Sequence, residues 1–268
     1  MSTPSFLYYN IVTTLRCNLK CKYCLAGCDA NLTWESDPIK TYESFKHAVD
    51  LIKESTIPSG ISIQGGEPLI SPSFWKLLSL IDTIDYPSDK VCITTNGLVF
   101  NKLPLNKLEL LVKRDIPIRI SKYPIEFNYN KLESFIKNLG LKFFYVESDV
   151  QRLVRITDKT QRFFWEHCFY DHPVKKDKDW SPAICRKDEI CVDIYNNNKL
   201  IPCSNISEWA NRTGNKLILN KDYYRFNELD TTDQVLKVLN EYHPACEYCA
   251  SAIFHPWFTD TNIKVKQI

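Results

Sequence analysis

Apolar residues recur at helical spacing in several separate segments of the chain. In the first of these, Phe45, Ala48, Val49 and Ile52 occupy positions i, i+3, i+4 and i+7, which predicts one buried helical face. A serine–proline pair, Ser71-Pro72, marks the start of a second helix, because serine caps helices and proline suits the first turn. We therefore expect helices around residues 45–52, 74–81, 108–112 and 132–139.

Short β-like runs separate these helical segments. Strands and helices that alternate in this way predict parallel βα units, so the expected fold class is α/β, with either an open sheet or a barrel. A glycine at position 140 closes the last of the four helices, as expected of a helix C-terminus. The expected strands are Phe6–Thr13, Ile61–Ile63, Val91–Thr95, Ile116–Ser121, Leu141–Val146 and Leu153–Ile156.

The alternation ends after residue 156. Residues 157–182 are rich in charges, prolines and aromatics, which is typical of a bridging segment. Beyond them, we expect a β-hairpin around Asn196–Lys199 and a helix near Thr231–Leu239. The pattern thus predicts a large α/β domain over residues 1–156 and a small, cysteine-bearing domain over residues 183–268.

Composition gives no reason to expect certain classes of partner. The 268 residues include 34 basic and 32 acidic side chains, for a net charge of +2, so nothing favours nucleic acid or an anionic membrane as partner. No segment approaches the roughly 18 apolar residues that span a bilayer. The first residues lack the features of a signal peptide, and we expect a cytoplasmic protein.

Eleven cysteines are many for a protein of a reducing compartment. Their odd number and tight grouping argue against a disulfide framework and favour metal ligands or catalytic groups. Three of them, Cys17, Cys21 and Cys24, form a C-x3-C-x2-C array directly after the first expected strand. Three thiolates on one loop can hold three irons of a four-iron cluster and leave the fourth iron open. A zinc site completed by Cys28 is the alternative.

Further segments accompany this array at the ends of the next strands. Gly65-Gly66-Glu67-Pro68 ends the second strand, and Thr94-Thr95-Asn96-Gly97 follows the third. Tyr23 stands just before the third cysteine of the array, and Ser121 ends the fourth strand. With the cysteine array, these features in this order resemble the radical S-adenosylmethionine (SAM) superfamily.

The resemblance implies a partial (β/α)6 TIM-like barrel with an iron–sulfur cofactor. It implies a [4Fe-4S] cluster on the three cysteines, with the amino and carboxylate groups of SAM chelating the open iron. The backbone of Gly65–Gly66 and the side chain of Glu67 would bind the methionine amino group. Tyr23 would lie near the adenine, Asn96 would face the cofactor, and Ser121 would contact its ribose. Reductive cleavage of SAM then yields a 5′-deoxyadenosyl radical that abstracts hydrogen from a substrate.

A second set of cysteines stands in the C-terminal part of the chain. These four thiols come from two separated segments and suit either a second cluster or zinc. The arrangement resembles the twitch domain, the truncated single-cluster relative of the SPASM domain. The resemblance therefore implies an auxiliary [4Fe-4S] cluster in a small hairpin-plus-helix domain. The expected ligands are Cys185, Cys203, Cys246 and Cys249.

Four cysteines belong to neither set. Cys92 and Cys191 lie in expected strands, which favours buried structural thiols. Cys28 and Cys168 lie in less regular surroundings. Since one cysteine returns a hydrogen atom to the substrate radical in radical epimerases, Cys28 and Cys168 are our candidate catalytic residues.

The resemblance leaves the substrate open. Relatives with a twitch domain favour a small polar, sugar-like molecule that is dehydrogenated or epimerised, with an external electron donor such as flavodoxin or ferredoxin. Peptide modification, as in maturases of ribosomal peptides, is the main alternative, and only sixteen residues precede Cys17, which leaves little room for a leader-binding domain. Two remote alternatives are an activase for a glycyl-radical partner and a non-enzymatic zinc-binding module.

Overall fold

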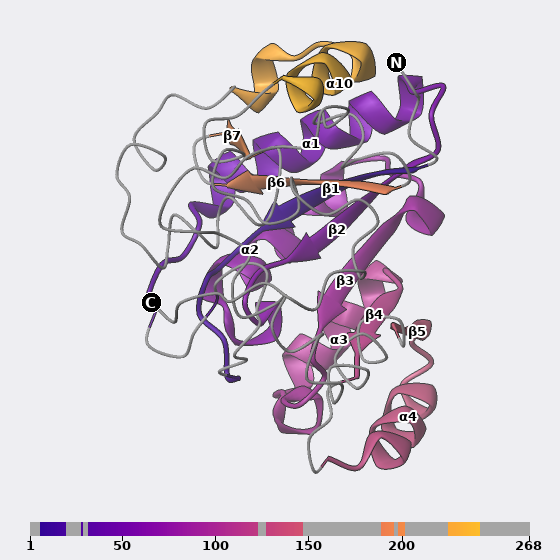
Figure 1. The fold of residues 1–268 in the computed structure, drawn as a ribbon. Coiled ribbons are helices and arrows are strands. Elements are labelled where there is room, and N and C mark those ends of the chain that lie inside the picture. The colour runs from indigo at the N-terminus through magenta and orange to yellow at the C-terminus, as the bar shows by residue number, and fades with distance from the viewer. Residues whose placement is uncertain are drawn as a thin grey trace, which may run out of the picture.

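A seven-stranded, mostly parallel sheet carries the fold in the computed structural model (Figure 1). The structure describes residues 6–19, 28, 32–122, 127–146, 189–195, 198–201 and 225–241. Across the sheet the strands follow the order β5-β4-β3-β2-β1-β6-β7, and only β7 runs antiparallel to its neighbour. The strands are β1 (Phe6–Val12), β2 (Ser59–Gln64), β3 (Val91–Thr95), β4 (Ile118–Ser121), β5 (Phe143–Val146), β6 (Glu189–Tyr195) and β7 (Lys199–Ile201).

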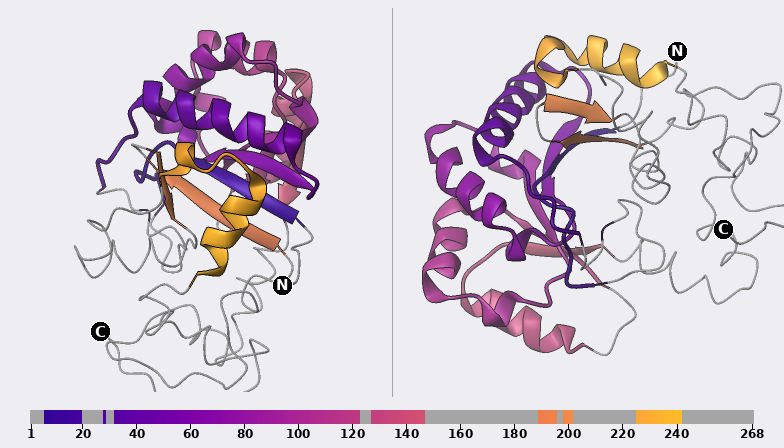
Figure 2. Two further views of the ribbon diagram at one scale, coloured as in Figure 1. Left: turned by 90° about the horizontal axis from the view of Figure 1, so that it is seen from above. Right: turned by 90° about the vertical axis from the view of Figure 1, so that its left-hand side faces the viewer.

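Helices follow the strands as the apolar spacing predicted. Helices α1 to α4 all lie on the same side of the sheet, as Figure 2 shows. The predicted α/β class is therefore confirmed, with a parallel sheet that is consistent with a partial TIM-like fold. The helices are α1 (Pro38–Glu54), α2 (Pro72–Leu80), α3 (Leu105–Arg114), α4 (Tyr129–Asn138) and α10 (Thr232–Asn240).

Local chemistry sets the ends of these helices. The Ser71 hydroxyl accepts a hydrogen bond from the Phe74 amide at 3.1 Å, so it caps α2 as the serine–proline pair predicted. Gly140, just beyond α4, has a φ of +72°, a conformation that glycine adopts without strain. At α10, Thr231 and Gln234 form a reciprocal capping box, which fixes the helix start.

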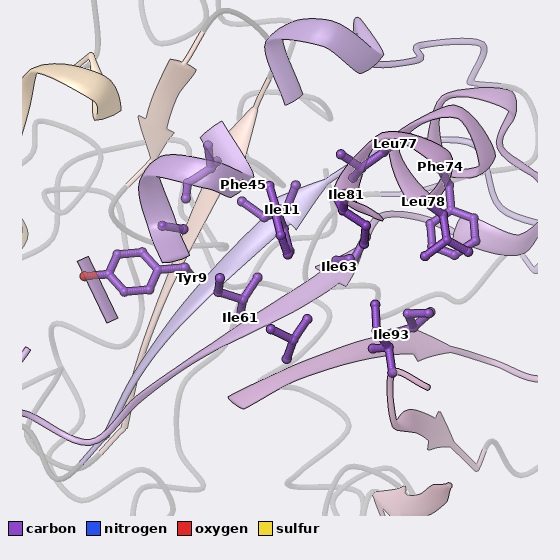
Figure 3. Packing of buried hydrophobic residues seen from close by; sticks show 14 of the residues in the cluster. Tyr9, Ile11, Phe45, Ile61, Ile63, Phe74, Leu77, Leu78, Ile81 and Ile93 are labelled. Carbon is purple, nitrogen blue, oxygen red and sulfur yellow. The ribbon is translucent and has the colours of Figure 1, made fainter. Parts of the chain in front are cut away.

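The main hydrophobic core lies between the sheet and helices α1 and α2. Alternate strand residues such as Ile11, Ile63 and Ile93 point toward these helices and are fully buried (Figure 3). Phe45 of α1 and Leu77 of α2 meet them from the helical side. Each such side chain contributes about 1.5–3 kcal/mol when it is fully buried, so this face holds the helices to the sheet.

The opposite face of the sheet, which we call the inner face, is mainly polar. Asn10 of β1 donates a hydrogen bond to Asp193 of β6 at 2.9 Å, and both side chains are almost fully buried. The hydroxyls of Ser62 and Thr94 lie 2.7 Å apart between β2 and β3. From the strand pairings, the inner face comprises Tyr8, Asn10, Val12, Ser62, Gln64, Cys92, Thr94, Arg119, Ser121, Phe144, Val146, Cys191, Asp193 and Tyr195.

The predicted C-terminal hairpin exists, and it extends the main sheet. Strands β6 and β7 form the antiparallel pair, and β6 also pairs in parallel with β1. Helix α10 packs near α1, and in the segment just before α10 the Leu229 carbonyl lies 3.0 Å from the His47 Nε2 of α1. The predicted strand Leu153–Ile156 and the bridging segment 157–182 lie outside the described residues, so the division into domains stays a prediction.

None of the helices in the described ranges is both long enough and apolar enough to cross a membrane.

Candidate cofactor site

Four parallel strands end at one edge of the sheet and bring the predicted cofactor residues to it. Cys17 follows β1, Gly65–Gly66 follow β2, Asn96 follows β3, and Ser121 is the last residue of β4. Because β1 to β4 are parallel neighbours, their carboxyl ends share this edge. Ser121 is half-buried and pairs with Val146 of β5.

The loop that begins with Cys17 is anchored at its base. The Leu15 amide donates to the Trp34 carbonyl at 3.1 Å, which joins the two ends of the loop. The Glu35 carboxylate accepts hydrogen bonds from the Thr14 hydroxyl at 2.9 Å and from the Ser71 hydroxyl at 2.5 Å. Glu35 therefore holds the loop to the start of α2. No motif in the sequence indicated this role.

The two glycines lie directly against the first residues of the cysteine loop. The Gly66 amide donates to the Thr14 carbonyl at 2.7 Å, and the Glu67 amide donates to the Arg16 carbonyl at 2.9 Å. A Cβ atom at Gly66 would lie 2.2 Å from the Arg16 carbonyl oxygen, and one at Gly65 would lie 2.4 Å from that of Thr14. Both positions therefore require glycine, because backbone packs on backbone there.

The Glu67 carboxylate is fully buried and points toward the end of β3. Its Oε1 accepts from the Leu69 amide at 3.0 Å and the Thr95 hydroxyl at 2.7 Å, and its Oε2 accepts from the Asn96 amide at 2.8 Å. Burial raises the pKa of Glu67 to about 7, although the three hydrogen bonds oppose this shift. The side chain thus ties the glycine segment to the residues after β3.

We expect Glu67→Gln to reduce the pH dependence of stability. In the wild type the folded-state pKa lies above the ordinary value of 4.5, so the unfolded chain loses its proton first as the pH rises. The free energy of unfolding should therefore fall between about pH 4.5 and pH 7, by roughly 3 kcal/mol at most from this group. Urea unfolding at pH 5 and pH 7.5 measures the difference. An equal pH dependence in wild type and variant would contradict the assignment.

Asn96 connects this network to the cysteine loop. Its Nδ2 donates to the Asn18 Oδ1 at 2.7 Å and lies 3.9 Å from the Cys17 Sγ. The Leu19 amide also points at this sulfur, at 3.4 Å. Amide donors around a sulfur stabilise its thiolate form, which is the form that binds iron, so Cys17 suits the role of a cluster ligand. The Asn18–Asn96 contact had no counterpart in the sequence prediction.

Most of the other predicted site residues fall outside the part of the chain that the structure describes. These are Cys21 and Cys24 of the array, Tyr23, the candidate catalytic Cys168, and the four C-terminal cysteines at positions 185, 203, 246 and 249. Within the described ranges, no three His, Cys, Asp or Glu residues lie close enough to hold a metal. The complete ligand sets therefore stay predictions.

Three of the remaining cysteines are described. Cys28 is buried in a small apolar cluster with Val12, Leu15 and Cys17, so it lies beside the cysteine loop. Cys92 is buried on the inner face, as predicted, and burial raises the pKa of its thiol. The prediction that Cys191 is buried was wrong: the residue is exposed on the inner face, at a part of β6 that pairs with β1 but not with β7.

A known family resembles the part of the chain that forms this site. Residues 11–121 match the sequence model of the Radical SAM superfamily. This segment, less than half of the chain, is thus similar to radical SAM domains. It contains the cysteine loop, the glycine segment, Asn96 and Ser121, which together form the edge described above.

Curated relatives share this domain over part of their length. The chain is 35% identical to a GTP 3′,8-cyclase of Desulforamulus reducens over 96 residues, which is 36% of this chain and 29% of the relative. It is 31% identical to an S-adenosylmethionine-dependent nucleotide dehydratase of Selenomonas ruminantium over 109 residues, or 40% of this chain and 35% of the relative. The chain thus matches about a third of the length of these relatives.

Among solved structures, the chain is similar to Streptococcus suis SuiB bound to S-adenosylmethionine. The likeness has a TM-score of 0.48 at 17% sequence identity, and it covers 91% of this chain and 65% of the other.

Proposed function

We propose that this protein is a radical SAM enzyme that acts on a nucleotide. The observation that carries the proposal is the junction of Cys17 with the Gly65–Gly66 backbone and Asn96 at one edge of the radical SAM domain. In the proposed complex, Cys17, Cys21 and Cys24 hold a [4Fe-4S] cluster to which SAM binds. When bound, this pair supplies a 5′-deoxyadenosyl radical, after one electron from an external donor cleaves SAM.

The protein's own residues position these groups. Gly65 and Gly66 bring backbone against the start of the cysteine loop, and the buried Glu67 carboxylate fixes the residues after β3. Ser121 offers a half-buried hydroxyl on the inner face at the same edge. We keep Tyr23 as the proposed contact for adenine, and Cys185, Cys203, Cys246 and Cys249 as proposed ligands of an auxiliary cluster.

The names of the curated relatives guide the choice of substrate. A GTP 3′,8-cyclase and a nucleotide dehydratase both act, by name, on nucleotides. The expected substrate was a small polar, sugar-like molecule, and we replace it with a nucleotide, which is also polar and contains a ribose. We therefore propose that hydrogen is taken from the substrate's ribose. Cys28 and Cys168 remain the candidates for returning a hydrogen atom, if the reaction is an epimerisation.

A cluster-loaded, anaerobic preparation of the full chain tests the proposal. We expect the electron paramagnetic resonance (EPR) signal of the reduced protein to shift when SAM is added, and 5′-deoxyadenosine to form. With GTP deuterated in its ribose, deuterium should pass into 5′-deoxyadenosine, and mass spectrometry of the nucleotide product identifies the reaction outcome. An EPR signal unchanged by SAM overturns the radical SAM assignment, whereas 5′-deoxyadenosine without deuterium overturns only the ribose as hydrogen source.

A further inference from the structure

An exposed aromatic residue lies beside a cationic residue on the inner face, close to the cofactor edge. Phe144 of β5 is 47% exposed, whereas its neighbours Phe143 and Tyr145 pack against the main core. Strand pairing places Phe144 directly beside Arg119 of β4. The pairing thus sets a flat aromatic residue and a cationic residue side by side on one face.

Arg119 belongs to the same inner face by its strand pairing. Burial raises the pKa of the Cys92 thiol, and the charge of Arg119 acts on that thiol in the opposite direction. Arg119 is half-buried, and its strand position lies between Thr94 of β3 and Phe144 of β5. Thr94 of β3 is the strand partner of Arg119 on its other side, so its side chain lies on the same face.

Thr94, Arg119 and Phe144 thus form a row across β3, β4 and β5 on the inner face. The row lies one step along the strands before the cofactor edge. Arg119 precedes Ser121 by two residues, which corresponds to about 7 Å along a strand. Figure 2 shows that no helix among α1 to α4 covers this side of the sheet. The row is thus next to the proposed cofactor residues without being part of them.

We propose that Phe144 and Arg119 form the subsite that selects the substrate, and that this substrate is a nucleotide whose base stacks on Phe144 and whose phosphate binds Arg119. A phenyl ring offers a flat apolar surface to a base, and a guanidinium binds phosphate oxygens in a two-pronged geometry. This inference rests on the proposed function and adds the residues that recognise the nucleotide.

Binding of three probes to the cluster-loaded full chain, with SAM present, tests each half of the subsite. The probes are GTP, guanosine, which lacks phosphate, and ribose 5-phosphate, which lacks a base. We expect Phe144→Leu, which keeps an apolar side chain but removes the ring, to raise the Kd of GTP and guanosine about tenfold and leave ribose 5-phosphate unchanged. Phe144→Tyr keeps the flat ring and should bind like wild type.

The complementary variant is Arg119→Gln. It should raise the Kd of GTP and ribose 5-phosphate by about tenfold or more and leave guanosine unchanged, because only the phosphate contact is lost. Matched controls lie on helices of the other face: Leu105→Ala removes an exposed apolar side chain of α3, and Lys131→Gln removes an exposed charge of α4. Both controls should bind all three probes normally.

Several outcomes overturn the subsite. The proposal fails if the wild type binds none of the probes, or if Phe144→Leu and Arg119→Gln bind GTP like wild type. It also fails if Phe144→Leu loses the SAM-dependent EPR shift and keeps GTP binding, because the ring then serves the cofactor's adenine. If a variant loses affinity equally for all three probes and also unfolds at a lower urea concentration, the residue has a packing role and the subsite is overturned. A wild type whose EPR signal ignores SAM overturns the proposed function itself.

Discussion

Cys17→Ala should abolish formation of 5′-deoxyadenosine, with a decrease of at least 1000-fold. Cys17 is the first residue of the cysteine array, and amide groups from Leu19 and Asn96 point at its sulfur. Removing one of three thiolates leaves the cluster without enough protein ligands to keep an open iron for SAM. The assay is 5′-deoxyadenosine measured by mass spectrometry, alongside iron content. Iron should fall by about half if an auxiliary cluster is present.

Cys191→Ala is the matched control for this variant. Cys191 is exposed on β6 and belongs to neither proposed ligand set. We expect its iron content and 5′-deoxyadenosine yield to equal those of the wild type. Full iron content and SAM cleavage in Cys17→Ala would instead remove Cys17 from the cluster site.

Gly66→Ala should lower activity by at least 100-fold while the protein still folds. The added methyl group would lie 2.2 Å from the Arg16 carbonyl oxygen and 3.0 Å from the Cys17 amide nitrogen, so the backbone that leads into the cysteine loop must move. Overpacking of this kind costs about 1–3 kcal/mol, and a displacement near 1 Å at a reactive site can cost 100-fold in rate. Urea unfolding and 5′-deoxyadenosine formation measure the two effects separately.

Gly140→Ala separates the effect on stability from the effect on the site. Its φ of +72° makes alanine cost about 1 kcal/mol, but a Cβ there meets no atom within 4 Å. This variant should lose stability comparably to Gly66→Ala and keep its SAM-dependent EPR shift. If both glycine variants retain activity, the close backbone approach at Gly66 is not important for function.

Local patterns in the sequence predicted most of the α/β layer because they act over short distances. Apolar spacing around Phe45 and Ile52 located α1, and Ser71 with the proline after it located the start of α2. The same local signals located the cysteine loop and the glycine segment, since each follows a strand. Their shared edge could then be predicted from the parallel order of the strands.

Long-range contacts and side-chain directions were not predictable in the same way. The pairing of β6 with β1 joins residues that lie 183 positions apart at Asn10 and Asp193, and no local pattern specifies it. The Glu67 side chain was expected to face SAM, but which group a carboxylate contacts depends on the packed neighbours Thr95 and Asn96. Polar and apolar residues alternate around Arg119, and this alternation could have predicted which residues form the inner face.

The pairing of β6 with β1 has a consequence for synthesis of the protein. Until the ribosome has made residues 189–195, β1 has β2 on one side and lacks its native partner on the other. A strand with an unpaired edge is prone to associate with other chains. A nascent chain that ends before β6 would therefore expose this edge, together with the Asn10 side chain that Asp193 later satisfies. Premature termination before β6 should yield aggregation-prone fragments, for which a chaperone would have to shield β1.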